Sequence, residues 1–250
     1  MKSDGGIRKG GPTGMTAQSG AQTFKIFSTG LPAIPLHGAA RIFEEMHGVR
    51  FKIVAGEPST WLPRVRDGEG DLVCVGAEYM MDDIEAEGLI LRETRATVGY
   101  RRSMIMVRRG NPRGIRTIQD LAEMDVKLLV CRGACQKGLW DDVASKAMVT
   151  DKIRSKIAEY GAGCLDTLRR WRRSEGRIDA GIVWNVYGRV WPAYCEMIEL
   201  PRDIEVFRST NVAILKSCSN RESLQDFVGF LRSDESRRVY EKWGWITKKP

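Results

Sequence analysis

The stretch Phe24-Lys-Ile-Phe-Ser-Thr-Gly-Leu-Pro32 joins a short apolar strand to a polar turn of the kind that begins a helix. The same plan returns in Phe51-Lys-Ile-Val-Ala-Gly-Glu-Pro-Ser-Thr-Trp61. A helix N-terminus carries backbone N–H groups without intrahelical partners and a partial positive charge, so such turns bind anions or polar ligands readily. Two successive copies of this plan predict a binding cleft.

Strand and helix patterns alternate outward from this stretch. Apolar residues recur at helical spacing from Leu36 to Met46 after the first turn, and Gly48 predicts the end of that helix. A third apolar run, Leu72 to Val75, leads into another helix. Three strand-to-helix units in succession predict a parallel sheet with right-handed crossovers, and ligands bind at the carboxyl ends of the strands in such sheets.

A second set of units follows residue 100. Strands are expected at 103–107, 127–131 and 180–184, with helices between them. The extended run 205–216 suits a strand that crosses back to the first set, and two amphipathic helices finish the chain. The pattern predicts an α/β protein of two lobes with mixed, mainly parallel sheets, a two-strand hinge and a ligand cleft between the lobes.

This pattern also predicts where the lobes divide. We expect residues 24–100 together with 209–250 to form the first lobe, and residues 101–208 to form the second. Residues 1–23 are expected to be a disordered or appended segment, because the beginning of the chain is rich in glycine and lacks an apolar pattern.

Composition narrows the class of protein. The chain has 250 residues, of which 42% are hydrophobic and 29% charged, as in ordinary globular proteins. No run approaches the roughly 18 to 20 apolar residues of a membrane span, and the N-terminus lacks the apolar core of a signal peptide. The net charge is +8, but the basic residues are scattered among acidic ones. That distribution favours solvated helix faces, so we expect no nucleic-acid partner.

The six cysteines show no metal-binding pattern. They stand at positions 74, 131, 135, 164, 195 and 218, without a Cys-x-x-Cys pair or a histidine at metal spacing. Cys131 and Cys135 flank Gly133, and they either form a disulfide in an oxidising compartment or stay reduced beside a ligand. We expect no metal and no cofactor.

The order of several motifs resembles a known family. The motifs are Phe24 to Gly30, Phe43-Glu-Glu-Met-His-Gly-Val49, Asp71-Leu-Val-Cys-Val-Gly-Ala77, Arg108-Arg-Gly-Asn-Pro-Arg-Gly-Ile115, Asp179-Ala-Gly-Ile-Val-Trp184 and Phe230-Leu-Arg-Ser-Asp-Glu-Ser236. Their order is similar to that of the type II extracellular solute-binding proteins of bacteria. Within that family, Gly138-Leu-Trp-Asp-Asp-Val143, Tyr100 to Val107, Phe207 to Val212 and Lys242 to Ile246 point to the molybdate and sulfate binders, and most of all to the accessory colonization factor C type. The resemblance covers residues 24–246.

This resemblance implies a type II periplasmic binding fold that captures a small anion, either an oxyanion or a small organic carboxylate or sulfonate. It implies delivery to an ABC-type permease or a membrane receptor, a periplasmic or otherwise exported location, and no enzymatic activity. We expect a monomer. Two alternatives stay open: the ligand-sensing domain of a receptor or transcriptional regulator, and a Cys-dependent enzyme on the same fold.

The candidate ligand-binding residues lie at strand ends and on the crossing strands. They are Ser28, Thr29, Gly30, Ser59, Thr60, Ala77, Arg101, Gly133, Trp184, Asn185 and Arg208. Hydroxyl and N–H groups donate to an anion without adding a fixed charge, and an arginine fork binds a carboxylate, sulfate or phosphate bidentately. The alternative roles are helix capping for the serines and threonines and salt bridges for the two arginines.

Overall fold

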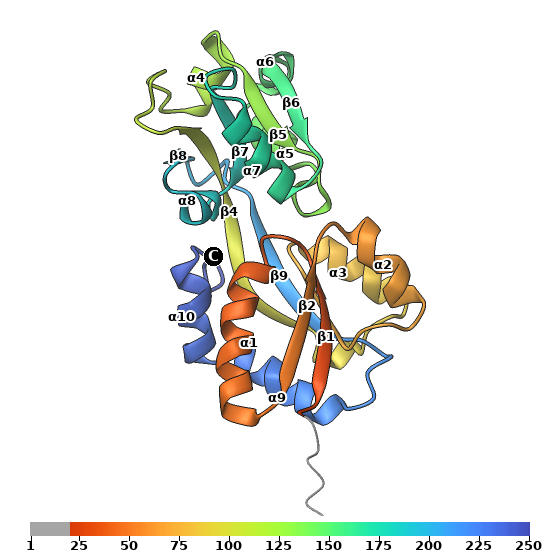
Figure 1. Ribbon diagram of the computed structural model, residues 1–250. Helices are drawn as coiled ribbons and strands as arrows, with labels where there is room; N and C mark the ends of the chain where they lie inside the picture. The colour runs from red at the N-terminus through yellow and green to blue at the C-terminus, as the bar shows by residue number, and fades with distance from the viewer. Residues whose placement is uncertain (1–20) are drawn as a thin grey trace, which may run out of the picture.

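A computed structural model describes residues 21–250, and Figure 1 shows them as two α/β lobes joined end to end. The first lobe contains β1 (Thr23–Ser28), α1 (Ala33–His47), β2 (Arg50–Ala55), α2 (Pro58–Arg66), β3 (Leu72–Val75), α3 (Glu78–Ala86), η1 (Arg92–Thr94), α9 (Arg221–Leu231) and α10 (Asp234–Lys242). The second lobe contains α4 (Ile118–Glu123), β5 (Leu128–Cys131), η2 (Ala134–Gln136), α5 (Leu139–Lys146), α6 (Thr150–Lys156), β6 (Ile157–Gly161), α7 (Cys164–Arg173), β7 (Ala180–Trp184), α8 (Tyr187–Val190) and β8 (Cys195–Glu199).

Two long strands, β4 (Ala96–Arg108) and β9 (Phe207–Ile214), run between the lobes (Figure 1). The strand order is β2-β1-β3-β9-β4-β7-β5-β6, and β8 pairs with β4. Along β4, pairing with β9 extends to Arg102, and pairing with β7 begins at Ser103. The predicted two-strand hinge is therefore confirmed.

The predicted strand-to-helix units are present in the first lobe. Strand β1 pairs in parallel with β2 and with β3, while β9 returns antiparallel to β3. Helix α1 buries its apolar face, and its Phe43 ring lies 5.1 Å from the Phe227 ring of α9. Gly48 ends the helix with a φ of 66°, and its N–H donates to the Glu44 carbonyl at 3.0 Å. Within residues 21–250, no helix is both long and apolar enough to cross a membrane.

Two strands of the second lobe were not predicted. Strand β6 continues directly from α6 and pairs only with β5, so its side chains alternate little between buried and exposed positions. Strand β8 pairs only with β4 and keeps three of its five residues half-buried. Neither strand has a continuous apolar run or a strict alternation of buried and exposed residues, which is why the sequence did not reveal either one.

The predicted lobe boundaries, 24–100 with 209–250 and 101–208, stay a prediction. The appended segment expected at 1–23 falls mostly outside the described residues, although β1 already begins at Thr23.

Candidate functional site

The loops that follow β1 and β3 meet the second lobe at the hinge strand β4. The Thr29 N–H donates to the Cys74 carbonyl at 3.0 Å, which holds the first loop against the end of β3. Just beyond β3, the Gly76 carbonyl accepts a hydrogen bond from Nη2 of Arg101 on β4. The turn after β1 and Arg101 on β4 therefore lie at the same edge of the sheet.

Arg101 is fully buried, with 0% of its surface exposed. Its guanidinium carbon lies 4.9 Å from the centre of the Trp184 ring and 5.9 Å from that of Trp245. Within residues 21–250, its Nε and Nη1 have no hydrogen-bond partner. An unpaired charge away from water is costly, so this position favours binding of an anion.

The loop after β1 provides a second unpaired polar atom. Thr29 is 2% exposed, and its Oγ1 has no hydrogen-bond partner, while Ser28 Oγ donates to the Thr29 carbonyl at 3.0 Å. Helix α1 begins at Ala33 and has no side-chain cap. The capping role considered for these two residues is therefore absent. A Cβ on Gly30 would lie 3.1 Å from a side-chain carbon of Leu165 in α7, so this loop touches the second lobe.

The second turn has a different arrangement from the one predicted. Ser59 and Thr60 are exposed within α2, and Thr60 Oγ1 donates to the Glu57 carbonyl at 2.7 Å. Neither hydroxyl caps the helix, because α2 has no side-chain cap. Their contact with a ligand stays a prediction.

Glu57 is the side chain of the second turn that reaches the second lobe. One carboxylate oxygen accepts the Ala134 N–H at 3.4 Å, and the carboxylate lies against Gly163. Burial raises the pKa of Glu57, because a half-buried carboxylate is less well hydrated. The negative charge of the nearby Cys164 thiolate raises this pKa further, and the hydrogen bond from the Ala134 N–H lowers it. Glu57 is not among the residues predicted from the sequence, although it is the only acidic residue in the two turns.

The candidates from the second lobe lie around the same junction. Trp184 stacks against Arg101 and donates its Nε1–H to the Cys135 carbonyl at 3.1 Å. Gly133 is buried beside Gly163. Asn185 uses both ends of its amide within the protein, since it accepts the Arg102 N–H at 3.1 Å and donates to the Gly244 carbonyl at 2.6 Å.

Two further candidates lie beside these loops. Ala77 is buried in extended backbone just before α3. Arg208 pairs across the strands with Arg101, but its Nη2 donates to Asp142 of α5 at 2.8 Å and its Nε lies 3.5 Å from Glu78 of α3. The salt-bridge role considered for Arg208 is therefore present, and it links the lobes. Contact between Arg208 and a ligand stays a prediction.

The thiols of Cys131, Cys135 and Cys164 lie close together in the second lobe. The Sγ atoms of Cys135 and Cys164 are 2.8 Å apart, and Cys164 Sγ also accepts from Gln136 Nε2 at 3.3 Å. Hydrogen bonds from the Cys131 and Cys135 thiols hold the pKa of Cys164 well below its usual value. All six cysteines are buried and free. Across the part of the chain that the structure describes, no cluster of His, Cys, Asp and Glu has a metal-site arrangement.

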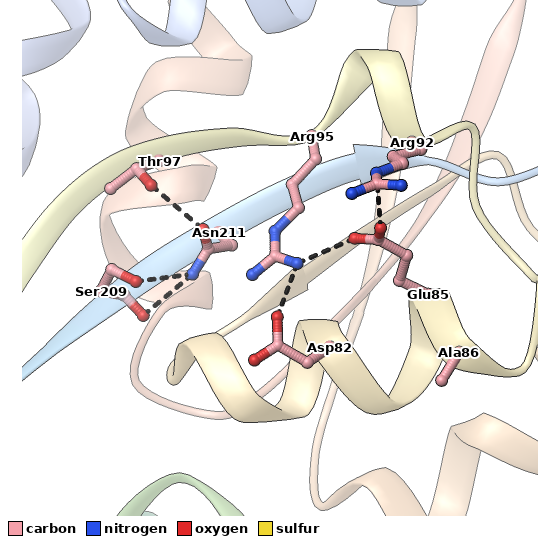
Figure 2. A pocket seen from close by; sticks show the side chains of 8 residues that line it. All are labelled: Asp82, Glu85, Ala86, Arg92, Arg95, Thr97, Ser209 and Asn211. Atoms are coloured by element: carbon pink, nitrogen blue, oxygen red, sulfur yellow. Dashed lines mark hydrogen bonds and ion pairs between the residues drawn. The ribbon is translucent and has the colours of Figure 1, made fainter.

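A separate cavity of about 720 Å³ lies on the outside of the first lobe, between α3 and the hinge strands (Figure 2). Arg95 forms ion pairs with Asp82 at 2.7 Å and with Glu85 at 2.9 Å, and Arg92 forms one with Glu85 at 2.9 Å. These charges neutralise one another. The cavity therefore lacks the unpaired charge found at Arg101.

Comparisons with known proteins give the family. The sequence model of the bacterial extracellular solute-binding proteins matches residues 24–246. The putative ABC transporter substrate-binding lipoprotein YvgL of Bacillus subtilis is 23% identical over 187 residues, which cover 74% of this chain and 71% of the relative. These relatives are solute-binding proteins rather than enzymes.

Solved structures show the same fold. Peb3 from Campylobacter jejuni is 21% identical, with a TM-score of 0.76 over 90% of this chain and 100% of that chain. The sulfate-binding protein SubI from Mycobacterium tuberculosis H37Rv is 14% identical, with a TM-score of 0.79 over 92% of this chain and 88% of that one. The periplasmic molybdate-binding protein of Azotobacter vinelandii is 14% identical, with a TM-score of 0.73 over 90% of this chain and 100% of that one. This chain belongs to the bacterial extracellular solute-binding proteins and has the type II fold of the molybdate and sulfate binders.

Proposed function

We propose that this chain is an exported, monomeric solute-binding protein that holds a small anion against Arg101 between its lobes and delivers it to an ABC-type permease. The observation that carries the proposal is the buried guanidinium, whose Nε and Nη1 lack partners. The description of YvgL as an ABC transporter substrate-binding lipoprotein supports export and delivery.

Arg101 and the nearby turn after β1 support an anionic ligand. A guanidinium suits a carboxylate, phosphate or sulfate group, and the unpaired Thr29 hydroxyl adds a neutral donor. A structure of PEB3, which is 21% identical to this chain with a TM-score of 0.79, has L-phospholactate bound. That small organic anion supports the same class of ligand here, and the sulfate and molybdate binders support inorganic oxyanions as the alternative.

Such a ligand needs no metal to bind well. A hydrogen bond to a charged group contributes roughly 1.5 to 3 kcal/mol. Several such bonds together exceed the roughly 8 kcal/mol of a micromolar complex, even after the cost of ordering both partners. Contacts with both lobes would also favour the closed form over an open one.

The first experiment is a thermal-shift screen at constant ionic strength. It compares sulfate, molybdate, tungstate, phosphate, phospholactate and small dicarboxylates as separate additions. We expect at least one of them to raise the melting temperature in a concentration-dependent way, because a ligand that binds only the folded state stabilises it. If none raises the melting temperature, the anion-binding proposal is wrong.

The Arg101→Gln variant tests the residue on which the proposal depends. We expect its affinity for the best anion of the screen to fall by about 10- to 100-fold, since a charge-assisted hydrogen bond is lost. The matched control is Arg109→Gln, because that side chain lies in the turn just beyond β4 and is 66% exposed. Calorimetric titration measures both variants. Equal affinities for Arg101→Gln and the unchanged protein would remove Arg101 from the site.

Delivery to a permease is tested in cells. We expect cells that produce the chain to take up the labelled anion faster than cells that lack it, and the Arg101→Gln variant to abolish the difference. Uptake that does not depend on the chain would contradict transport while leaving anion binding intact.

A further inference from the structure

Two loops of the second lobe run in close contact just before Cys135 and Cys164. A Cβ on Gly133, in the loop after β5, would lie 2.5 Å from the Cα of Gly163, which precedes α7. The parallel pairing of β5 and β6 brings the two loops together. A further hydrogen bond continues this pairing into the loops, because the Arg132 N–H donates to the Gly161 carbonyl at 2.8 Å. The absence of side chains on both glycines lets the backbones approach closely enough for the sulfur atoms beyond them to meet.

The sulfur atoms of Cys135 and Cys164 lie 2.8 Å apart and are shielded from solvent. Cys164 is the first residue of α7, where the backbone N–H groups favour a negative charge. Gln136 Nε2 donates to its sulfur at 3.3 Å, and the neighbouring thiols lower the pKa of Cys164. A thiolate is the form of cysteine that attacks a disulfide, so Cys164 is the better nucleophile of the pair.

We propose that Cys135 and Cys164 form a disulfide in the exported protein. The Cys164 thiolate attacks one sulfur of a disulfide oxidant, such as oxidised glutathione or a thiol–disulfide oxidoreductase, and one oxidant thiolate leaves. The Cys135 thiolate then attacks the Cys164 sulfur of the mixed disulfide, and the second oxidant thiolate leaves. Two protein thiols are oxidised, and the oxidant disulfide is reduced to two thiols.

The geometry selects this pair over the Cys131–Cys135 pair that the sequence leaves open. Cys131 Sγ accepts the Gly133 N–H at 3.3 Å and its thiol also hydrogen-bonds to Cys164, whereas the sulfur atoms of Cys135 and Cys164 lie 2.8 Å apart. The family is extracellular, and disulfides form and persist in exported proteins.

The bond would stiffen the second-lobe side of the proposed anion site. The Cys135 carbonyl accepts the Trp184 Nε1–H, and the Trp184 ring lies against Arg101. A Cβ on Gly76 of the first lobe would lie 3.1 Å from the Cys135 Cβ. The disulfide does not depend on which ligand binds, or on whether an anion binds at all.

The experiment maps the thiols after refolding. The reduced, unfolded protein is refolded with excess oxidised glutathione, so that access to the buried sulfurs is not limiting, and free thiols are then alkylated. We expect one disulfide, joining the peptides of Cys135 and Cys164, and a protein lighter by two hydrogens before alkylation. Alkylation of all six cysteines, or a disulfide that includes Cys131, would overturn the proposal.

Two variants and a melting measurement complete the test. Cys131→Ser should retain the disulfide, and Cys164→Ser should lose it and leave Cys135 alkylated. The oxidised protein should melt about 5 °C or more above the reduced protein, because the bond closes a long loop. Cys164→Ser should show no such difference. An equal difference in Cys164→Ser would contradict the assignment.

Discussion

At the scale of single residues, Arg101 and Thr29 are two of the six side chains within residues 21–250 that bury a polar atom without a hydrogen-bond partner. Arg101 Nε and Nη1 and Thr29 Oγ1 are buried without hydrogen bonds. Folded proteins usually pair such groups, because an unpaired buried donor costs about 1 to 3 kcal/mol. A ligand that accepts from both residues would recover this cost, so the same atoms lower stability and favour binding.

The opposing effects of the Thr29 hydroxyl on stability and on binding are tested by Thr29→Val, which removes the hydroxyl and keeps the shape of the side chain. We expect the ligand-free variant to be more stable by about 1 kcal/mol, since a buried unpaired group is removed. Its affinity for the anion should fall by roughly 10-fold. Thermal melting and calorimetric titration measure the two effects. The control is Thr23→Val, where the side chain is exposed at the start of β1; equal affinity losses in both variants would contradict a role for Thr29.

The sequence identified the first turn more accurately than the second. It predicted the polar turn at Ser28 to Gly30, which lies at the junction of the lobes. At the second turn it proposed Ser59 and Thr60, which are exposed, and did not propose Glu57, which reaches the second lobe. Residue type shows which groups can bind, but the direction of the first turn of α2 decides which of them face the second lobe.

At the scale of elements, the N-terminus of α7 meets the turn before α2. Gly163 has extended backbone, with φ of −163°, so alanine would fit its conformation, but a Cβ there would clash with the Glu57 carboxylate. Glycine at position 163 therefore leaves room for the Glu57 side chain of the first lobe, and the backbone conformation does not require it.

The Gly163→Ala variant should weaken closure of the lobes. Overpacking costs about 1 to 3 kcal/mol, so we expect roughly a 10-fold or greater loss of anion affinity. Adding Glu57→Ala should restore most of this loss, because the clashing side chain is removed. Gly229→Ala is the control, since a Cβ there meets no atom within 4 Å. Calorimetric titration and small-angle scattering follow affinity and closure; a double variant as weak as Gly163→Ala would refute the clash.

Glu57 also predicts a pH dependence. Burial raises its pKa above the ordinary value of 4.5. Its contribution to stability is therefore complete below pH 4.5 and is lost as the pH rises through the raised pKa. We expect the melting temperature of Glu57→Gln, relative to the unchanged protein, to increase between about pH 4 and pH 7. A difference that is constant over this range, or that decreases, would show that the carboxylate is not held in a desolvated position.

At the scale of the whole molecule, the hinge strands set the relation between the lobes. Arg208 on β9 bonds to Asp142 of the second lobe and lies near Glu78 of the first. The Arg208 side chain is 25% exposed, so each pair contributes at most about 1 kcal/mol. A contact of this size can bias closure without determining it.

The role of Arg208 is tested by a double-mutant cycle. If Arg208 acts through the lobes, Arg208→Ala and Asp142→Asn should each lower anion affinity by about 2- to 5-fold, and the double variant should be no weaker than either. If Arg208 instead touches the ligand, its variant should lose more and Asp142→Asn should lose nothing. Titration of the three variants separates these outcomes.

The strand-to-helix units, the returning strand and the family to which the chain belongs can all be predicted from the sequence alone. These features follow from local apolar periodicity, turn residues and motif order, which neighbouring residues encode. The fold was needed to show that Arg101 is buried with two unpaired nitrogens, that Arg208 is paired, and that Cys135 meets Cys164 rather than Cys131. The physical reason is that burial and pairing depend on segments far apart in the chain, and a few ångströms of approach between the lobes determine both.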